Sequence, residues 1–159
     1  MAREAELALT LNQVQSAEAL ISQAQDAEAM HPYVLAVSGL TWLIDGPAGA
    51  ARAAFESALQ RDPKDAKALT GLGLAEIKLG NLQSGQQKLQ AANEADPGNS
   101  LALTYLGRVQ YQLGHAEAAR ASWRSAQQAD PKDPTPWLYQ AQAELQANLG
   151  GLNRVKRHV

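Results

Sequence analysis

The sequence predicts an all-α fold made of stacked helix hairpins, and three observations lead to this prediction. Ala, Leu and Gln are abundant and favour helices, whereas the residues that favour strands are scarce. Three Asp-Pro pairs, ending at Pro63, Pro97 and Pro131, follow one another at an interval of 34 residues. Small and large residues keep a constant phase around these prolines. A fixed interval of this length is typical of helical repeats.

The positions that align around the prolines predict how the hairpins pack. Small residues recur at three positions: Gly39, Gly73 and Gly107; Gly46, Gly80 and Gly114; and Ala58, Ala92 and Ala126. Large residues recur at two others: Leu35, Leu69 and Leu103; and Phe55, Leu89 and Trp123. A small residue on one helix lets its neighbour approach closely, and the large residue beyond it fills the space. The pattern therefore predicts two helices in each repeat.

Glycine and proline predict where these helices end. Gly46, Gly80 and Gly114 stand where a left-handed residue would close the first helix of each hairpin. Pro47 and Asn81 can begin the second helix, and the proline of each Asp-Pro pair stops it. The predicted helices cover residues 33–45, 48–61, 67–79, 82–95, 101–113 and 116–129.

The pattern continues more weakly toward the amino terminus. Ala17, Ile21 and Ala24 have the small-large-small spacing of a second helix, which predicts a helix over residues 16–29. Residues 2–11 would then form the short first helix of an earlier hairpin. Alternatively, the two segments form one long helix.

Toward the carboxyl terminus, a further helix is predicted to begin near Trp137 and to end near Asn148. The pair Gly150-Gly151 breaks the pattern, and the residues after it are basic: Arg154, Lys156, Arg157 and His158. We therefore expect a helical repeat domain over residues 1–148 and a flexible basic tail over 149–159. Because repeat arrays need polar caps at their ends, we also expect the chain to be part of a longer array, with a tail foreign to it.

Composition and motifs argue against several classes of function. With 14 basic and 16 acidic residues the net charge is −2, so no basic surface is expected to bind nucleic acid. The chain has no cysteine and its three histidines lack the spacing of metal ligands, so neither a metal nor a cofactor is expected. No apolar stretch is long enough to cross a bilayer. No arrangement of Ser, His or carboxylates indicates an enzyme, and the cellular compartment is left open.

The repeat resembles the tetratricopeptide repeat family, which has the same period. The aligned leucines match the family's large residue at repeat position 4, Gly39 and its equivalents match the small residue at position 8, and the prolines match position 32. The family's aromatic residue at position 11 is matched only by Trp42, because Glu76 and Gln110 stand there in the next two repeats. The resemblance covers residues 35–131. It implies a right-handed superhelical array of antiparallel hairpins, with three full repeats and partial flanking repeats.

The resemblance also implies a binding groove, lined in this family by positions 2, 5, 9, 12 and 13 of each first helix. These positions are Tyr33, Ala36, Leu40, Leu43 and Ile44; Lys67, Thr70, Leu74, Ile77 and Lys78; and Leu101, Thr104, Arg108, Tyr111 and Gln112. The early part is apolar and the later part is partly basic, so we expect a ligand with a hydrophobic anchor followed by acidic or polar groups. Alternatively, the large apolar members pack on a neighbouring hairpin or on the helix of residues 16–29: Leu40, Leu43, Ile44 and Ile77.

Two functions follow as hypotheses. The first is a non-catalytic scaffold that holds a peptide or protein partner in the concave groove. The alternative is a self-assembling structural module, a homo-oligomer that pairs through uncapped repeat ends. The Lys and Asn clamp with which chaperone-binding members grip a C-terminal carboxylate is absent at positions 5 and 9, so acidic chaperone tails are not expected to bind.

Overall fold

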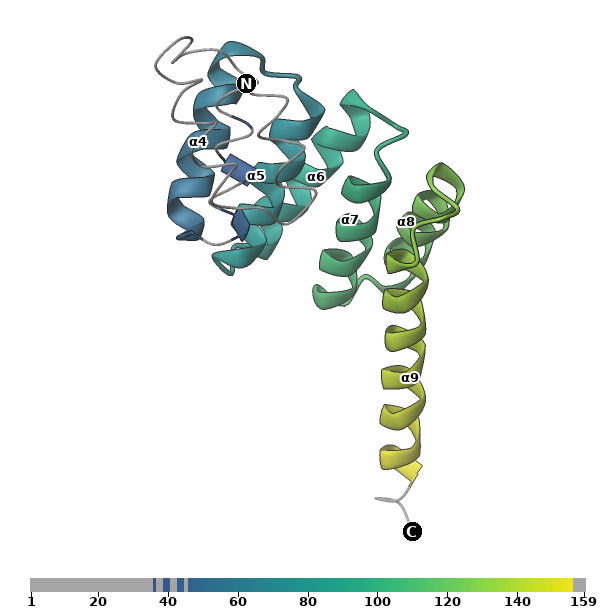
Figure 1. The fold of residues 1–159 in the computed structure, drawn as a ribbon. Helices are drawn as coiled ribbons and strands as arrows, with labels where there is room; N and C mark the ends of the chain where they lie inside the picture. The colour runs from purple at the N-terminus through teal and green to yellow at the C-terminus, as the bar shows by residue number, and fades with distance from the viewer. Residues whose placement is uncertain (1–35, 37–38, 41–42, 45, 156–159) are drawn as a thin grey trace. The chain divides into compact units, whose positions relative to one another are not determined.

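The computed structural model describes residues 36, 39–40, 43–44 and 46–155, and within them it contains helices and no strand (Figure 1). The helices are α4 (Ala48–Arg61), α5 (Ala66–Lys78), α6 (Leu82–Ala95), α7 (Ser100–Gln112), α8 (Ala116–Ala129) and α9 (Thr135–Val155). The all-α prediction is confirmed, and each predicted end from residue 48 to residue 129 is correct to within one residue. The predictions for residues 2–11 and 16–29, and Tyr33, lie outside the described residues.

The turns at Gly80 and Gly114 form as these two glycines predict. Gly80 and Gly114 adopt positive φ angles of 86° and 84°. In both turns the two amides that follow the helix bond back to its last carbonyls: Gly80 N–H to Ile77 O at 3.0 Å and Asn81 N–H to Glu76 O at 2.9 Å in the first. These two hydrogen bonds satisfy carbonyl groups that would otherwise have no partner at the helix end. A residue with a side chain would be strained at either glycine.

The chain divides at Pro97 and Gly98 into two compact units. In the first unit, Phe55 of α4 is fully buried beside two glycines. A Cβ on Gly39 would lie 2.8 Å from the Phe55 ring, and one on Gly71 of α5 would overlap it. In the same unit a Cβ on Gly73 would lie 2.8 Å from Leu89 of α6. Because these glycines have no side chain, the helices can approach one another closely, as the repeat predicts.

In the second unit the corresponding large residue is Trp123 of α8. Its indole lies against Gly107 of α7, and its Nε1–H donates to Thr104 O at 3.2 Å. Helix α9 packs against both α7 and α8, and its carboxyl end extends beyond them (Figure 1). The unit is thus a complete hairpin followed by the first helix of the next repeat.

Helix α9 is longer than predicted. We expected it to end near Asn148, but it continues through Gly150 and Gly151 to Val155. A glycine costs a helix only about 1 kcal/mol relative to alanine, and no proline follows here to stop propagation. The division at residue 148 between a domain and a flexible tail stays a prediction. Among the helices that the structure describes, none is long and apolar enough to cross a membrane.

Candidate functional site

The second unit contains a pocket of about 420 Å³ between α7 and α9, with α8 at its base. Its lining combines three aromatic side chains, three glutamines, one arginine and one alanine: Tyr111, Trp123, Tyr139, Gln112, Gln142, Gln146, Arg108 and Ala143. Both walls are helices of the same kind, the first helix of a hairpin. Helical periodicity brings the residues of each wall to one face, because residues three or four apart on a helix are neighbours.

Tyr111 fixes the base of the pocket. Its hydroxyl donates to the Ala143 carbonyl oxygen of α9 at 3.1 Å, and its ring centroid lies 6.1 Å from that of Trp123. Ala143 is buried in the same cluster, together with Trp123 and Ala119. A hydrogen bond and an apolar contact therefore hold α9 to the hairpin at one point. The base of the pocket is accordingly apolar and built on rigid helices.

Arg108 lies between two tyrosines on the wall of the pocket. Its guanidinium carbon lies 5.3 Å from the Tyr139 ring centroid and 6.0 Å from that of Tyr105, within the range of a cation–π contact. Its Nη1 donates to the Tyr139 hydroxyl at 3.3 Å, and the two tyrosine rings meet edge to face. Burial raises the pKa of Tyr105, Tyr139 and Asp133 raise it further, and Arg108 opposes them.

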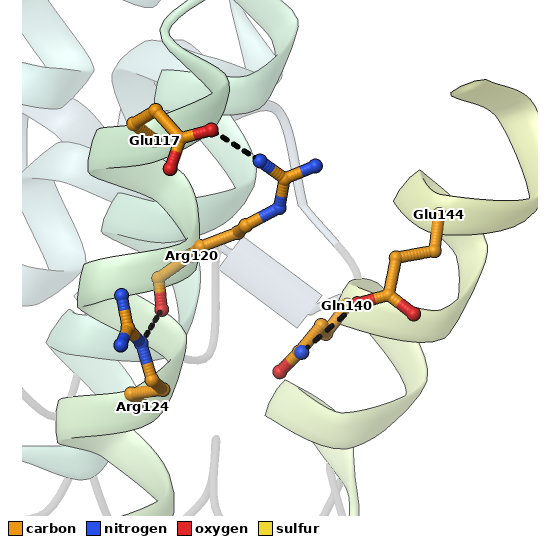
Figure 2. A network of polar contacts seen from close by, with 5 residues as sticks. All are labelled: Glu117, Arg120, Arg124, Gln140 and Glu144. Atoms are coloured by element: carbon orange, nitrogen blue, oxygen red, sulfur yellow. Dashed lines mark hydrogen bonds and ion pairs between the residues drawn. The ribbon is translucent and has the colours of Figure 1, made fainter.

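Four other charged side chains of this unit have partners of their own on α8 and α9. Figure 2 shows Arg120 donating to the Glu117 carboxylate on α8, and Gln140 donating to Glu144 on α9 at 3.0 Å. Arg124 bonds the Arg120 carbonyl at 3.4 Å. No carboxylate within the described residues forms an ion pair with Arg108. The positive charge of Arg108 is thus not neutralised by a salt bridge in this part of the chain.

One repeat position differs between the packed core of the first unit and the pocket of the second. The residue that follows Phe55 by 16 positions is Gly71, and the residue that follows Trp123 by the same interval is Tyr139. Gly71 has no side chain, so Phe55 fits directly against α5. Tyr139 instead packs against the cluster of Trp123, Ala119 and Ala143, and it lines the pocket together with Trp123.

In the first unit, the residues expected to line the groove are divided between core and surface. Ala36 and Thr70 are buried, and the Thr70 hydroxyl bonds the Ala66 carbonyl at 2.7 Å. Leu40 packs against the core, and Leu74 is partly buried. Lys67 and Lys78 are exposed, and Lys78 Nζ donates to the Leu43 carbonyl at 3.0 Å.

The large apolar residues of the expected groove are packed to different degrees. Leu40 and Leu43 pack against the Phe55 core, and Ile77 fills the space beside Gly85, on the second helix of its own hairpin. Ile44 remains about half exposed, at 48%.

In the second unit, three of the expected groove residues meet in the pocket: Arg108, Tyr111 and Gln112. Leu101 is half exposed and Thr104 is buried. The predicted groove residues did not include those of α9, the opposite wall of the pocket, because the prediction ended with the third repeat. Repeat positions 9 and 13 of the next first helix are Gln142 and Gln146, so extending the same rule to α9 would have found both.

The residues that the structure describes contain no cluster of three His, Cys, Asp or Glu side chains that could hold a metal ion. The pocket lining contains no carboxylate, histidine or serine. Its groups are suited to binding: rings for apolar contact, amides that both donate and accept hydrogen bonds, and one cation.

Comparison with known proteins agrees with the repeat pattern. The profile described as "Tetratricopeptide repeat" matches residues 3–66, 46–100, 70–134 and 104–151. No curated protein sequence matches the chain. Solved structures do match. A tetratricopeptide protein of Thermus thermophilus has a TM-score of 0.82 and 20% identity, over 91% of this chain and 80% of that one.

Two further solved structures show the same likeness. The crystal structure of MamA has a TM-score of 0.72 and 19% identity, over 91% of this chain and 85% of that one. The pilF protein of Pseudomonas aeruginosa has a TM-score of 0.79 and 16% identity, over 92% of this chain and 67% of that one. At such identities the likeness establishes the fold.

Proposed function

The chain belongs to the tetratricopeptide repeat family, and on that premise we propose that it is a non-catalytic scaffold that holds a peptide segment of another protein. Proteins of this fold commonly present a concave surface to a partner. The segment would bind in the pocket between α7 and α9. Three residues of the groove that the sequence predicts, Arg108, Tyr111 and Gln112, support this location.

The observation that carries the proposal is the composition of the pocket. Sites that bind ligands are mostly apolar cavities of about 300 to 1,000 Å³ with a few polar groups that fix orientation. This pocket has a volume of about 420 Å³, an aromatic base of Tyr111 and Trp123, and a rim of glutamines. Such a space accepts roughly one or two side chains of a peptide, and the amides can bond the peptide backbone on either side.

Selection from a peptide-display library on the full chain would test this function. We expect the selected peptides to bind with one-to-one stoichiometry in calorimetry. Replacing an exposed pocket residue with a bulky one, Gln146→Trp, should weaken binding at least tenfold, about 1.4 kcal/mol. The matched control is Gln128→Trp, at an exposed position of α8 outside the pocket, which should bind as the parent does. A selection that enriches no peptide, or peptides that tolerate Gln146→Trp, would overturn the proposal.

A specific observation favours self-assembly as a second candidate. Three large apolar side chains of α9 are exposed: Trp137 at 55%, Leu138 at 65% and Leu145 at 59%. Apolar groups gathered on one helix can pair with another copy. Light scattering over a dilution series tests this candidate, because a mass that stays at one chain throughout would remove it.

A further inference from the structure

Arg108 is a cation whose hydrogen-bonding capacity is mostly unused within the described part of the chain. A guanidinium group carries five N–H donors. One of these bonds the Tyr139 hydroxyl, at 3.3 Å. The rings of Tyr105 and Tyr139 contact the group and hold it in place. Because an aromatic contact limits the freedom of the side chain, less entropy is lost when a ligand bonds the remaining N–H groups.

The surroundings of Arg108 favour a negative ligand. Asp133 is close enough to Tyr105 to raise its pKa, but it forms no ion pair with Arg108. Glu144, on the same helix as Tyr139, is bonded to Gln140 (Figure 2). The pocket lining itself contains one charged residue, Arg108. A carboxylate that reaches this partly buried group would interact more strongly than it would on an open surface, because the aromatic walls lower the local dielectric constant.

The remaining lining determines what stands beside the carboxylate. Tyr111, Trp123 and Ala143 form an apolar base that adjoins Arg108. Gln112, Gln142 and Gln146 are neutral, so they favour neither sign of charge and can bond peptide N–H and C=O groups. One cation beside one apolar surface matches a single acidic residue next to a large apolar residue. A run of acidic residues would leave its further charges without a partner in the pocket.

We propose that this pocket selects an internal peptide segment in which an Asp or Glu stands next to a large apolar residue. The carboxylate binds the N–H groups of Arg108, the apolar side chain lies on Tyr111, which packs on the buried Trp123, and the glutamines bond the backbone. Because the glutamines recognise backbone on both sides, a free chain end is not required. This inference rests on the proposed function, since it names the partner of the same site.

Substituting the charged residues of the peptide and of the protein in turn tests the inference. The probe is the tightest peptide from the display selection, synthesised with acetylated and amidated ends, and its affinity is measured by fluorescence anisotropy. Replacing its acidic residue with Gln should weaken binding to the unaltered protein at least tenfold, and replacing it with Lys should weaken binding further. Arg108→Glu should reverse this order and prefer the Lys peptide. Arg124→Gln, an exposed α8 arginine outside the pocket, should bind as the parent does.

The outcomes separate this inference from the function on which it rests. If the Gln peptide binds as tightly as the acidic one, the inference is wrong while peptide binding stands. If binding requires a free C-terminal carboxylate, the assignment to an internal segment is wrong. If no peptide is selected at all, the function itself fails. The peptide series uses the unaltered protein, so it remains decisive even where a substitution at Arg108 lowers stability.

Discussion

The two units use one packing rule with different residues, and the difference distinguishes a packed core from the surroundings of a pocket. In the first unit, Phe55 is enclosed by Gly39 and Gly71 on two successive first helices. In the second, Trp123 lies against Gly107, and Tyr139 packs against the cluster that Trp123 forms with Ala119 and Ala143. Trp123 and Tyr139 both line a pocket of about 420 Å³. The same repeat position thus holds glycine in the packed core of the first unit and tyrosine at the pocket of the second.

The largest effect is expected from Trp123→Ala. Trp123 is almost completely buried and its Nε1–H donates to Thr104 O. Removing the ring should lower the free energy of unfolding by about 3 to 5 kcal/mol, through lost burial and the cavity left behind. Urea denaturation followed by circular dichroism measures this loss. A loss below about 1 kcal/mol would show that Trp123 of α8 does not pack closely against α7.

The second largest loss of stability is expected when a methyl group is added at Gly71. The Cβ of Gly71→Ala would overlap the Phe55 ring, so we expect a loss of about 1 to 3 kcal/mol. Gly49→Ala is the matched control on α4, where a Cβ meets nothing within 4 Å, and it should raise stability by up to about 1 kcal/mol. In a Phe55→Leu background the cost of Gly71→Ala should shrink. If both alanines behave alike, close approach does not hold α4 to α5.

A smaller loss of stability is expected when the polar residues at repeat position 11, Glu76 and Gln110, lose their hydrogen-bond donors. Glu76 and Gln110 are equally buried, but their donors differ: the buried Ser122 donates to the Gln110 side-chain oxygen at 2.7 Å, and the exposed Asn81 donates to Glu76, also at 2.7 Å. Ser122→Ala should cost roughly 1 to 2 kcal/mol, because a buried acceptor loses its donor. Asn81→Ala should cost less than about 1 kcal/mol, because water can replace the amide. Thermal unfolding of both variants checks this order, and the reverse order would contradict it.

The smallest effect concerns the Tyr105 hydroxyl at alkaline pH. Burial raises the pKa of Tyr105 above its ordinary value of 10.0, so folding favours the neutral form. The resulting stability is complete below about pH 10 and is lost as the pH rises through the raised pKa. The parent should therefore lose stability above pH 10 more steeply than Tyr105→Phe. Parallel curves for the two proteins would show that Tyr105 does not contribute.

Local chemistry explains why most of the fold could be predicted from the sequence. Gly80 and Gly114 mark turns because a positive φ angle strongly favours glycine, and each Asp-Pro pair marks a helix end because proline cannot continue the hydrogen-bond ladder. The end of α9 was placed wrongly because the Gly150-Gly151 pair only weakens a helix. No local rule distinguishes a weakened helix from a terminated one.

The candidate site could be predicted only in part. Repeat positions identify Arg108, Tyr111 and Gln112, because each position has a fixed direction on its helix. They also indicate Thr70 and Thr104, which are buried. Whether a residue at such a position reaches solvent depends on the size of residues on neighbouring helices, such as Tyr139. That is a property of contacts between repeats, and a position within one repeat does not encode it.

Packing within each described unit has a consequence for how quickly the chain folds. Helix α5 contacts α4 and α6, and α9 contacts α8 and α7, so the packing pairs found there join helices that are adjacent in sequence or separated by one helix. Contacts between nearby segments require only short loops to close, and helical proteins of this kind fold in roughly microseconds to milliseconds. Each unit should accordingly form its hairpin before a growing chain is much longer, which leaves apolar surfaces such as Trp123 exposed only briefly.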